Sequence, residues 1–498
     1  MDKRIRQSIL LGVVFCFLSL YGCQENIRQN PKSSILNDVH SQLNATEVAE
    51  VVYPKSIEDI VKIVQRSRKE GKAVSISGGR HAMGGQQFGR DTIHISMIEM
   101  DDVLAFDQEK GIVKVEAGIT WPKLIEYLKK ARAGRWPQWT IKQKQTGADN
   151  LTLGGTLSAN AHGRGVHFKP IIEDVAAFTL VDAKGNILNV SREENSELFK
   201  LAIGGYGLFG VIATVDLKLQ YRRKLQRVVE VISIDQLPEK TKQRIDEGFL
   251  YGDFQYKTNE QAEDFMRVGV FSTYKPVPWD TPMPPARIHL MPNEWHKLML
   301  LAHTDKEKAF EVYSRHYLKT NGQIYWSDEL QLGYYDENYE ERLKTSMADY
   351  REGSLMITEV YVPPEEINNF IEKIIQDERQ FHFNIIYGTM RLIKQDDESF
   401  LAWAKRDYAC VIFNLRVEHS PKGLEKAKND FQRIIDRALE LDGSYYLTYH
   451  RWARKDQVLK AYPQFVEFLK LKRRYDPQEI FQSEWYRYYK TLFAKELK

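Results

Sequence analysis

The sequence predicts an α+β protein built from small mixed sheets, and three observations support this class. Between residue 51 and about residue 224, short apolar stretches with a period of two alternate quickly with short helical stretches. The regular strand–helix–strand rhythm of a parallel Rossmann sheet is missing. Hydrophobic residues make up 43% and charged residues 28% of the 498 residues, which are globular values, so disordered and fibrous classes are excluded.

The N-terminus is typical of an export signal. Basic residues precede the apolar run Ile9–Leu20, which is shorter than the roughly 20 residues that a membrane span needs. The next residues, Leu-Tyr-Gly-Cys ending at Cys23, are similar to a bacterial lipobox. We therefore expect a lipoprotein-type signal peptide over residues 1–22, with a lipid on Cys23 that anchors the exported protein to a bacterial membrane. An uncleaved anchor or an ordinary secretory signal is the alternative.

The three cysteines cannot form a disulfide framework. If Cys16 is removed with the signal and Cys23 carries lipid, Cys410 is the only remaining thiol, so no internal disulfide is expected. Residues 23–45 are polar and predict a tether.

The first elements follow from apolar spacing and capping. Ser56 is a candidate cap for a helix over 57–64, whose apolar residues share one face. Residues 74–76 alternate as a strand that leads into a glycine loop. Residues 112–118 alternate at period two, and 121–131 predict a helix.

A hairpin and a helix–strand pair complete this region. Residues 178–181 and 187–190 flank a turn-forming segment, which predicts a β-hairpin. Residues 197–202 predict a helix, and 211–219 alternate as a strand. Beyond it, 224–440 predicts a second α+β region rich in tyrosine and tryptophan.

The last stretch, 441–498, is predicted to be mostly helical. An amphipathic helix over Val458–Arg474 ends before Tyr475-Asp476-Pro477.

Three glycine-rich segments, 77–86, 147–163 and 204–212, carry the chemistry of the first region. Paired glycines let successive backbone N–H groups converge on an anion, so three such segments predict a diphosphate-bearing cofactor. Gly205-x-Gly207-x-x-Gly210 matches the Rossmann dinucleotide fingerprint, but here a helix precedes it and a strand follows. That order is the reverse of the motif, so a nicotinamide site is excluded.

The ordered segments resemble the FAD-binding domain of the vanillyl-alcohol oxidase/p-cresol methylhydroxylase flavoproteins. The resemblance rests on GGRHAMGGQ after a strand, on LTLGGTLSANAHGRG, on the hairpin and on ELFKLAIGGYGLFGVI, and it covers about 51–223. The second segment is also similar to decaprenylphosphoryl-ribose oxidase. The motif Tyr475-Asp476-Pro477-x-x-x-Phe481-x-Ser483 is similar to the closing motif of aldonolactone and alditol oxidases.

The resemblance implies an α+β fold with a two-subdomain FAD-binding domain over 46–223. It also implies a second α+β domain for substrate over 224–440, and a C-terminal segment, 441–498, whose helices return to the FAD domain.

The resemblance implies that FAD is attached covalently through His81, the position at which many members link the flavin 8α-methyl group. Non-covalent contact with His81 is the alternative. The second segment lacks the cysteine of bicovalent members, so a single linkage is expected. The further residues implied in cofactor binding are Ser77, Gly78, Gly79, Arg80, Ala82, Gln86, Gly147, Gly154, Gly155, Ser158, His162 and Ile212. No metal is expected at His162 and His167, because no cysteine or carboxylate partner stands at a suitable spacing.

Three catalytic candidates come from the second half of the chain. Arg391 matches the arginine with which aldonolactone and alditol oxidases support negative charge on reduced flavin, whereas their acidic position is Thr389 here. Glu359 is predicted to replace that acid from a neighbouring strand, although Glu359 and Arg391 would also suit a plain cross-strand pair. His450, in a segment that partly resembles the family's His-Trp-Gly-Lys, is predicted to accept the hydroxyl proton; a core histidine is the alternative.

The sequence therefore predicts an FAD-dependent oxidoreductase that transfers hydride from a CH–OH group to flavin N5. The expected substrate is a small polyol, sugar lactone or related alcohol, and O2 or another acceptor reoxidises the flavin. Amine oxidation like that of cytokinin dehydrogenase is one alternative, and a non-catalytic flavin- or ligand-binding lipoprotein is another. The net charge of +3, from 71 basic and 68 acidic residues, gives no overall attraction to nucleic acid.

Overall fold

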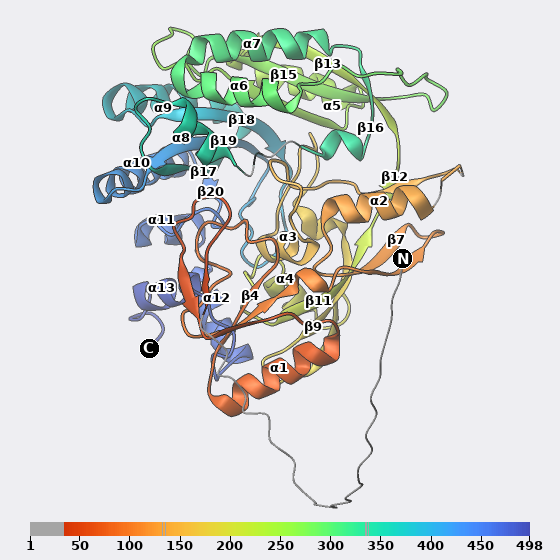
Figure 1. Cartoon of the computed structure of the whole chain (residues 1–498), viewed down its shortest axis with the longest axis vertical. Coiled ribbons are helices and arrows are strands. Elements are labelled where there is room, and N and C mark those ends of the chain that lie inside the picture. Colours follow the sequence, from red (N-terminus) through yellow and green to blue (C-terminus); the bar gives the residue numbers. More distant parts are fainter. Residues whose placement is uncertain (1–33, 132, 135, 334–335, 337) are drawn as a thin grey trace, which may run out of the picture. The chain divides into compact units, whose positions relative to one another are not determined.

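The structure, a computed structural model, describes residues 34–498 apart from 132, 135, 334, 335 and 337 (Figure 1). The predicted signal peptide, with Cys16 and Cys23, lies outside the described residues. Among the helices of the described part, none is long and apolar enough to cross a membrane.

Residues 34–45 are folded, whereas the sequence predicted a tether there. β1 (Ser34–Leu36) pairs antiparallel with β2 (Thr46–Val48). Between the two strands, Asp38 Oδ1 accepts the backbone N–H of His40 at 3.0 Å, and Asn44 Nδ2 donates to Asp38 Oδ2 at 2.9 Å and to the Met83 carbonyl at 2.8 Å. The polar side chains that suggested a solvated segment instead satisfy the backbone of a turn.

Two small sheets form the region predicted to hold the cofactor, which confirms the α+β class. A parallel sheet has the order β3 (Glu50–Val52), β5 (Ile93–Ser96), β4 (Val74–Ser77). An antiparallel sheet has the order β10 (Ile187–Ser191), β9 (Val175–Val181), β11 (Val211–Lys218), β7 (Ile112–Glu116), β6 (Val103–Asp107). The predicted hairpin is the β9–β10 pair.

The helices of this region begin where the sequence supplies caps. Ser56 Oγ accepts the backbone N–H of Asp59 at 3.2 Å and starts α1 (Ile57–Glu70), which Gly71 ends in a left-handed conformation. The remaining helices are α2 (Trp121–Ala131), α3 (Leu153–Ala159) and α4 (Ser196–Ala202). Helix α3 lies inside a glycine-rich segment and was not predicted.

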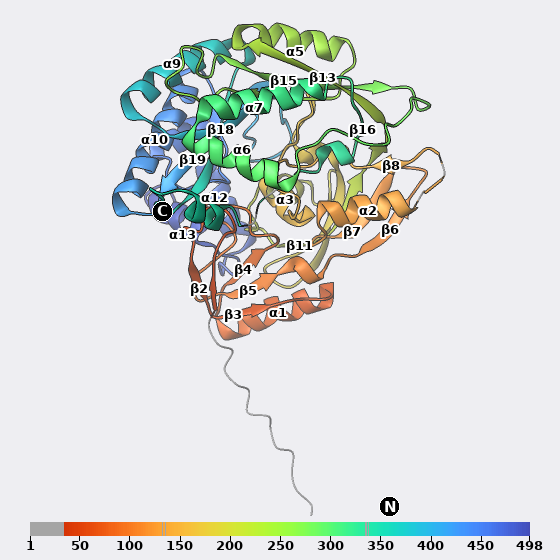
Figure 2. The same cartoon turned by 45° about the horizontal axis from the view of Figure 1, so that its top comes forward.

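An eight-stranded antiparallel sheet dominates the second region. Its order is β16 (Ile324–Trp326), β13 (Lys224–Ser233), β15 (Val268–Val277), β14 (Tyr251–Tyr256), β18 (Ile385–Ile393), β19 (Tyr408–Glu418), β17 (Gly353–Val362), β20 (Ser444–Tyr445). Figures 1 and 2 show this sheet at one end of the folded part and α1 at the other.

Helices cover both faces of the large sheet. On one face, α6 (Pro292–Thr304) and α7 (Lys306–Lys319) pack over β18 through Leu298, Ala309 and Ile386. On the other, α10 (Pro421–Glu440) packs against β17 and β19, and α9 (Ile367–Phe381) packs against α10 and, through Phe370 on Phe413, against β19. The shorter helices are α5 (Leu237–Asp246) and α8 (Tyr339–Ser346), and β8 (Trp139–Thr140) pairs with β12 (Gln220–Tyr221).

The C-terminal helices return to the first region, as predicted. The predicted helix Val458–Arg474 is interrupted, because Pro463 lacks a backbone N–H and its ring clashes with the preceding turn. The chain instead forms α11 (Lys455–Ala461) and α12 (Phe465–Tyr475), followed by α13 (Glu484–Leu492).

The return is anchored on β4. Val74 donates its N–H to the Ile480 carbonyl at 2.6 Å and accepts the Gln482 N–H at 2.9 Å, so the closing motif extends the parallel sheet.

Candidate functional site

A narrow cleft lies between the loop after β4 and helix α3, and all three glycine-rich segments reach it. Most of the residues predicted to bind the cofactor line it: Ser77, Gly78, Gly79, Arg80, His81, Ala82, Gln86, Gly154, Gly155, Ser158 and Ile212. The third segment adds Tyr206, Gly207 and Gly210. Gly147 lies elsewhere, in the wall of a second, larger cavity.

The loop after β4 leaves backbone donors for a ligand. The N–H groups of Gly78, Gly79 and Arg80 donate to no other residue that the structure describes, whereas the Arg80 carbonyl accepts the Val39 N–H at 3.1 Å. Arg80 adopts φ +59°, a left-handed conformation that helps successive N–H groups point into one concavity. Such a nest of N–H groups is suited to an anion.

Glycine is required in this loop because it lies directly against the segment before α3. A β-carbon on Gly78 would lie 1.9 Å from Thr152 Oγ1, and one on Gly79 would lie 2.3 Å from the Asn150 carbonyl oxygen. Side chains at these positions would therefore fill the cradle in which the loop and the segment meet. The narrow cleft with its row of N–H donors fits the diphosphate and adenosine part of FAD.

His81 stands where the cleft opens into the larger cavity and lines both. Its Nδ1 is 2.8 Å from Nε2 of His40, which folds over it from the β1–β2 segment. Burial, with a smaller electrostatic contribution from neighbouring His40, lowers the pKa of His81 to about 3, and burial lowers the pKa of His40 to about 4. Both imidazoles are therefore neutral near pH 7, the state in which a ring nitrogen is a nucleophile.

The larger cavity, of about 1010 Å³, lies between α6–α7 and one face of the eight-stranded sheet. Alternate residues of a strand point to the same face, which explains the contribution of Tyr387, Thr389 and Arg391 from β18 and of Asp253 and Gln255 from β14. The side chains shared with the cleft are His81, Gln145 and Leu151.

Arg391 lies in the larger cavity, as expected of a residue that contacts substrate or flavin. In the sheet register, Arg391 is opposite Cys410 of β19, and Cys410 is opposite Tyr361 of β17. Its buried Nε has no hydrogen-bond acceptor among the described residues. The Arg391 guanidinium therefore lines the cavity without being fully hydrogen-bonded to the described residues.

Glu359 is not next to Arg391, because β19 lies between β17 and β18. The alternative of a cross-strand pair is therefore wrong. Glu359 is 2% exposed and lines neither cavity. Its carboxylate accepts His162 Nε2 at 2.8 Å and the Tyr449 hydroxyl at 3.4 Å. Burial alone would raise the pKa of Glu359, but His162, Tyr361 and Arg391 together shift it downward, so it is ionised.

His162 does not line the cleft and instead belongs to this buried group. The sequence showed no metal-binding partner for it, yet Glu359 and Cys410 approach it in space, with Cys410 Sγ 4.0 Å from His162 Nε2. Burial raises the pKa of the Cys410 thiol well above its usual value. The group is best described as a hydrogen-bonded core cluster.

His450 lies outside both cavities. Its ring stacks on Phe431 with centroids 4.7 Å apart, and its Nε2 is 3.3 Å from Thr358 Oγ1. Burial lowers its pKa to about 3. This is the environment of a core histidine, the alternative noted above, and it offers no path to a substrate proton.

Several residues at the junction were not singled out in the sequence. Tyr449 follows Thr448, whose carbonyl accepts Gln86 Nε2 at 3.0 Å and the Met83 N–H at 3.2 Å. The β20–α11 loop is thereby held against the loop that carries His81, and the Tyr449 side chain enters the larger cavity. Nothing in the local sequence marks Tyr449, because its partners come from distant strands.

Comparison with known proteins finds the FAD binding domain family over residues 48–191. L-galactono-1,4-lactone dehydrogenase of Arabidopsis thaliana is 28% identical over 210 residues, which are 41% of this chain and 33% of that protein. L-gulonolactone oxidase of Bos taurus is 32% identical over 166 residues, 33% of this chain and 36% of that protein. Cytokinin dehydrogenase 9 of Oryza sativa subsp. japonica is 30% identical over 193 residues, 37% of this chain and 36% of that protein.

The matched part of the chain spans about a third of the length of these curated relatives. The FAD binding domain family match contains the first two glycine-rich segments and His81, and the third segment completes the same cleft. FAD is therefore the cofactor that the comparisons and the cleft agree on. Residues 48–191 therefore match the FAD binding domain family, and this domain is similar to that of the vanillyl-alcohol oxidase/p-cresol methylhydroxylase flavoproteins.

Proposed function

We propose that the protein is an FAD-dependent oxidoreductase that oxidises a CH–OH group of a small, sugar-like molecule. The observation that carries the proposal is the meeting of the cofactor cleft with a second cavity at His81. When bound, FAD supplies the hydride acceptor. A flavin extending from the cleft toward His81 would expose its reactive ring to whatever occupies the larger cavity.

The residues of the chain then have distinct tasks. Gly78, Gly79 and Arg80 hold the cofactor diphosphate through their backbone N–H groups. Arg391 contributes a fixed positive charge at the cavity wall, which stabilises negative charge that develops during hydride transfer. Burial raises the pKa of Tyr449 well above its usual value, so its hydroxyl stays protonated and positions a substrate oxygen by hydrogen bonding.

The substrate class is supported by the relatives, two of which are named for aldonolactones. The cytokinin dehydrogenase match keeps amine oxidation as a second candidate. The polar wall formed by Thr389, Gln255 and Asn414 favours a hydroxyl-rich substrate, because such side chains both donate and accept hydrogen bonds.

Covalent attachment of FAD to His81 is part of the proposal. The neutral imidazole and its contact with His40 support it, since a deprotonated ring nitrogen is the nucleophile. Protein precipitated with acid is expected to stay yellow and to give a fluorescent band on a denaturing gel, and His81→Ala is expected to release its flavin. Complete release of FAD from the unaltered protein would contradict the linkage.

We also propose export and anchoring through a lipid on Cys23, supported by the signal-like N-terminus. The unaltered chain is expected in the membrane fraction of a bacterial host, and Cys23→Ala in the soluble fraction. An unmodified Cys23 in the mass spectrum of the mature protein would contradict this part of the proposal.

The central experiment is anaerobic reduction of the bound flavin. Neutral polyols, aldonolactones, sugar acids and a cytokinin-like amine are added separately, and the yellow absorbance is followed. At least one hydroxyl compound is expected to bleach the flavin. Bleaching by the amine alone would favour the second candidate, and no bleaching by any member would contradict both.

A further inference from the structure

Three arginines, Arg391, Arg164 and Arg227, follow one another across the sheet wall of the larger cavity. Arg391 is on β18, and Arg227 is on β13. Arg164 lies beside β14, where its carbonyl accepts the Gly252 N–H at 2.9 Å and its Nη1 is 3.6 Å from Asp253. We call Arg391, Arg164 and Arg227 the arginine row.

The arginine row carries more positive charge than its surroundings neutralise. Asp253 pairs with Arg164, but no carboxylate of the described residues lies within 4.0 Å of Arg227 or Arg391. Other carboxylates lining the cavity have basic partners outside the row: Glu329 with Arg222 and Arg287, Asp336 with His296 and Arg342, and Glu340 with Arg416. The positive charges of Arg227 and Arg391 are therefore not neutralised by a carboxylate of the described residues, and an anionic ligand would neutralise them.

Arg227 is the clearest case, because it is only 9% exposed and yet lines the cavity. Its Nε donates to the Tyr274 hydroxyl at 2.8 Å, and its Nη1 donates to Thr320 Oγ1 at 2.9 Å. The rings of Tyr325, Tyr274 and Tyr317 surround the guanidinium at 4.7, 5.1 and 5.1 Å from their centroids. All these partners are neutral, and a buried cation without a counter-ion is unfavourable unless a ligand provides one.

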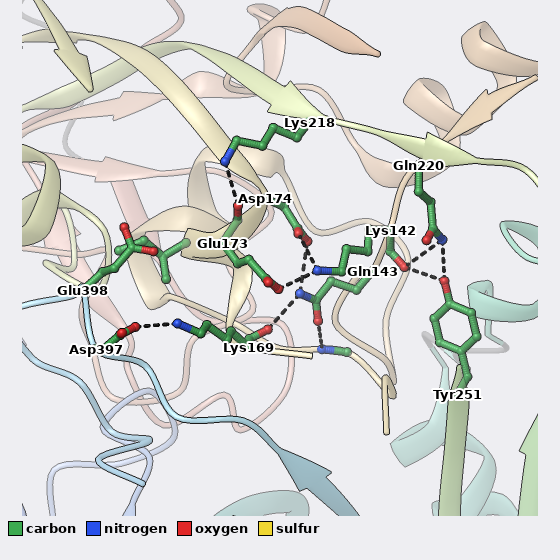
Figure 3. Close-up of polar contacts among 12 residues, drawn as sticks. Lys142, Gln143, Lys169, Glu173, Asp174, Lys218, Gln220, Tyr251, Asp397 and Glu398 are labelled. Carbon is green, nitrogen blue, oxygen red and sulfur yellow. Dashed lines mark hydrogen bonds and ion pairs between the residues drawn. The ribbon is translucent and has the colours of Figure 1, made fainter. Parts of the chain in front are cut away.

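The residue before Arg164, Gly163, is bound to the polar network around Gln143 and Lys142 that Figure 3 shows. Gln143 accepts the Gly163 N–H at 3.2 Å and donates to Asp174 Oδ2 at 3.0 Å. The Tyr251 hydroxyl donates to the Lys142 carbonyl at 2.7 Å, which ties the same segment to β14. The Arg164 backbone is thus held before any ligand arrives, as a preformed binding site requires.

We propose that Arg227 and Arg164, at the end of the arginine row away from Arg391, bind an anionic group, a carboxylate or a phosphate, on a sugar-like substrate, at a distance from the carbon that is oxidised. This inference rests on the proposed function, which places the reacting carbon near Arg391. Three strand spacings of about 4.8 Å separate β18 from β13, so an anion at Arg227 lies roughly 14 Å across the sheet from that strand. That separation and the cavity volume suit an acidic saccharide longer than one sugar ring.

The test is equilibrium binding to the FAD-loaded protein, measured by calorimetry. The probes are digalacturonate with its neutral methyl ester, and lactose 1-phosphate with lactose. The acid of at least one pair is expected to bind about tenfold or more tightly than its neutral counterpart, with a preference that falls as NaCl rises. A stronger preference in the first pair assigns a carboxylate, and one in the second pair assigns a phosphate. Equal affinities within both pairs, or no binding of either acid, would overturn the inference.

Variants assign the preference to the arginine row. Arg227→Gln is expected to remove most of it, and Arg227→Lys to keep part of it, with FAD content unchanged in both. Arg244→Gln is the matched control, because Arg244 is also partly buried and lies 4.8 Å from the centroid of an aromatic ring, Phe249, but pairs with Glu230 outside the cavity. Undiminished preference in Arg227→Gln would contradict the inference. An acid that binds with the expected preference but never reduces the flavin would contradict the proposed function and leave this inference standing.

Discussion

The cofactor cleft and the larger cavity adjoin each other, but one is formed mainly by backbone and the other mainly by side chains. The cleft is made of backbone: three glycine-rich segments within residues 77–212 supply turns, N–H groups and space. The cavity is made of side chains, which converge from strands as far apart in sequence as β13 and β18. A backbone site leaves a sequence pattern because only glycine fits it, whereas a side-chain site depends on pairings that no local pattern shows.

The largest expected effect is a loss of stability of the cofactor region, caused by a change in the closing motif, outside the three glycine-rich segments. Asp476 accepts the N–H of Ile480 at 2.9 Å and of Phe481 at 2.8 Å, and it pairs with the fully buried Lys472. Asp476→Ala leaves a buried ammonium unpaired and frees the strand beside β4, so denaturant unfolding should show a loss of about 3–5 kcal/mol. A loss below about 1 kcal/mol would mean that the closing motif does not stabilise the fold.

The next effect distinguishes the role of the larger cavity from that of the cofactor cleft. Arg391→Gln is expected to slow anaerobic flavin reduction about 100-fold, because a preorganised positive charge at the reacting centre is lost. FAD content should not change, since Arg391 lines only the larger cavity. Loss of FAD from this variant, or an unchanged rate, would contradict the division of tasks.

A complementary variant acts on the cleft alone. Gly79→Ala places a methyl group 2.3 Å from the Asn150 carbonyl and pushes the loop away from its partner, so FAD should bind weaker by about 1–3 kcal/mol. Gly333→Ala is the control, because a β-carbon there meets no atom of the described residues within 4 Å. Flavin content after gel filtration measures both; equal retention in the two variants would show that the cradle is not tight.

The smallest effect concerns the network beneath the arginine row. Burial raises the pKa of Asp174 from 3.8 to about 6, so the folded protein binds a proton that the unfolded chain releases between about pH 4 and 6. The stability contributed by this group is therefore present below pH 4 and is lost as pH rises through 6. Asp174→Asn should flatten the profile in that window and raise stability at pH 7 by about 1–2 kcal/mol, because the penalty of a buried charge disappears.

A loss of stability in Asp174→Asn would also be informative. If Asp174→Asn lowers stability at pH 7, the ion pair with Lys142, 3.4 Å away, outweighs burial of the carboxylate.

Much of the first region could be predicted because its signals are local. Ser56, the spacing in α1 and the turn of the β9–β10 hairpin are all short-range features. Residues 34–45 were misjudged because a polar turn and a tether have the same composition. Helix α3 was missed because its glycines suggested only a loop.

The second region was less accessible to sequence reasoning. Arg391 was found through a resemblance, but the strand between it and Glu359 could not be inferred. His450 occupies a motif position yet packs on Phe431. No local sequence pattern identifies Arg227 as a binding residue. Its proposed role depends on three tyrosines contributed by other elements and on the absence of a carboxylate partner among the described residues.

The most direct test of the account is an anaerobic titration of the FAD-loaded protein with a saccharide acid that binds it, followed through the flavin absorbance. Because the cleft and the cavity meet at His81, we expect a saturable change of the flavin bands followed by bleaching, and the same change at higher concentration in Arg227→Gln. Saturated binding by calorimetry without any change in the flavin bands would contradict the proposal that the cleft and the cavity form one site.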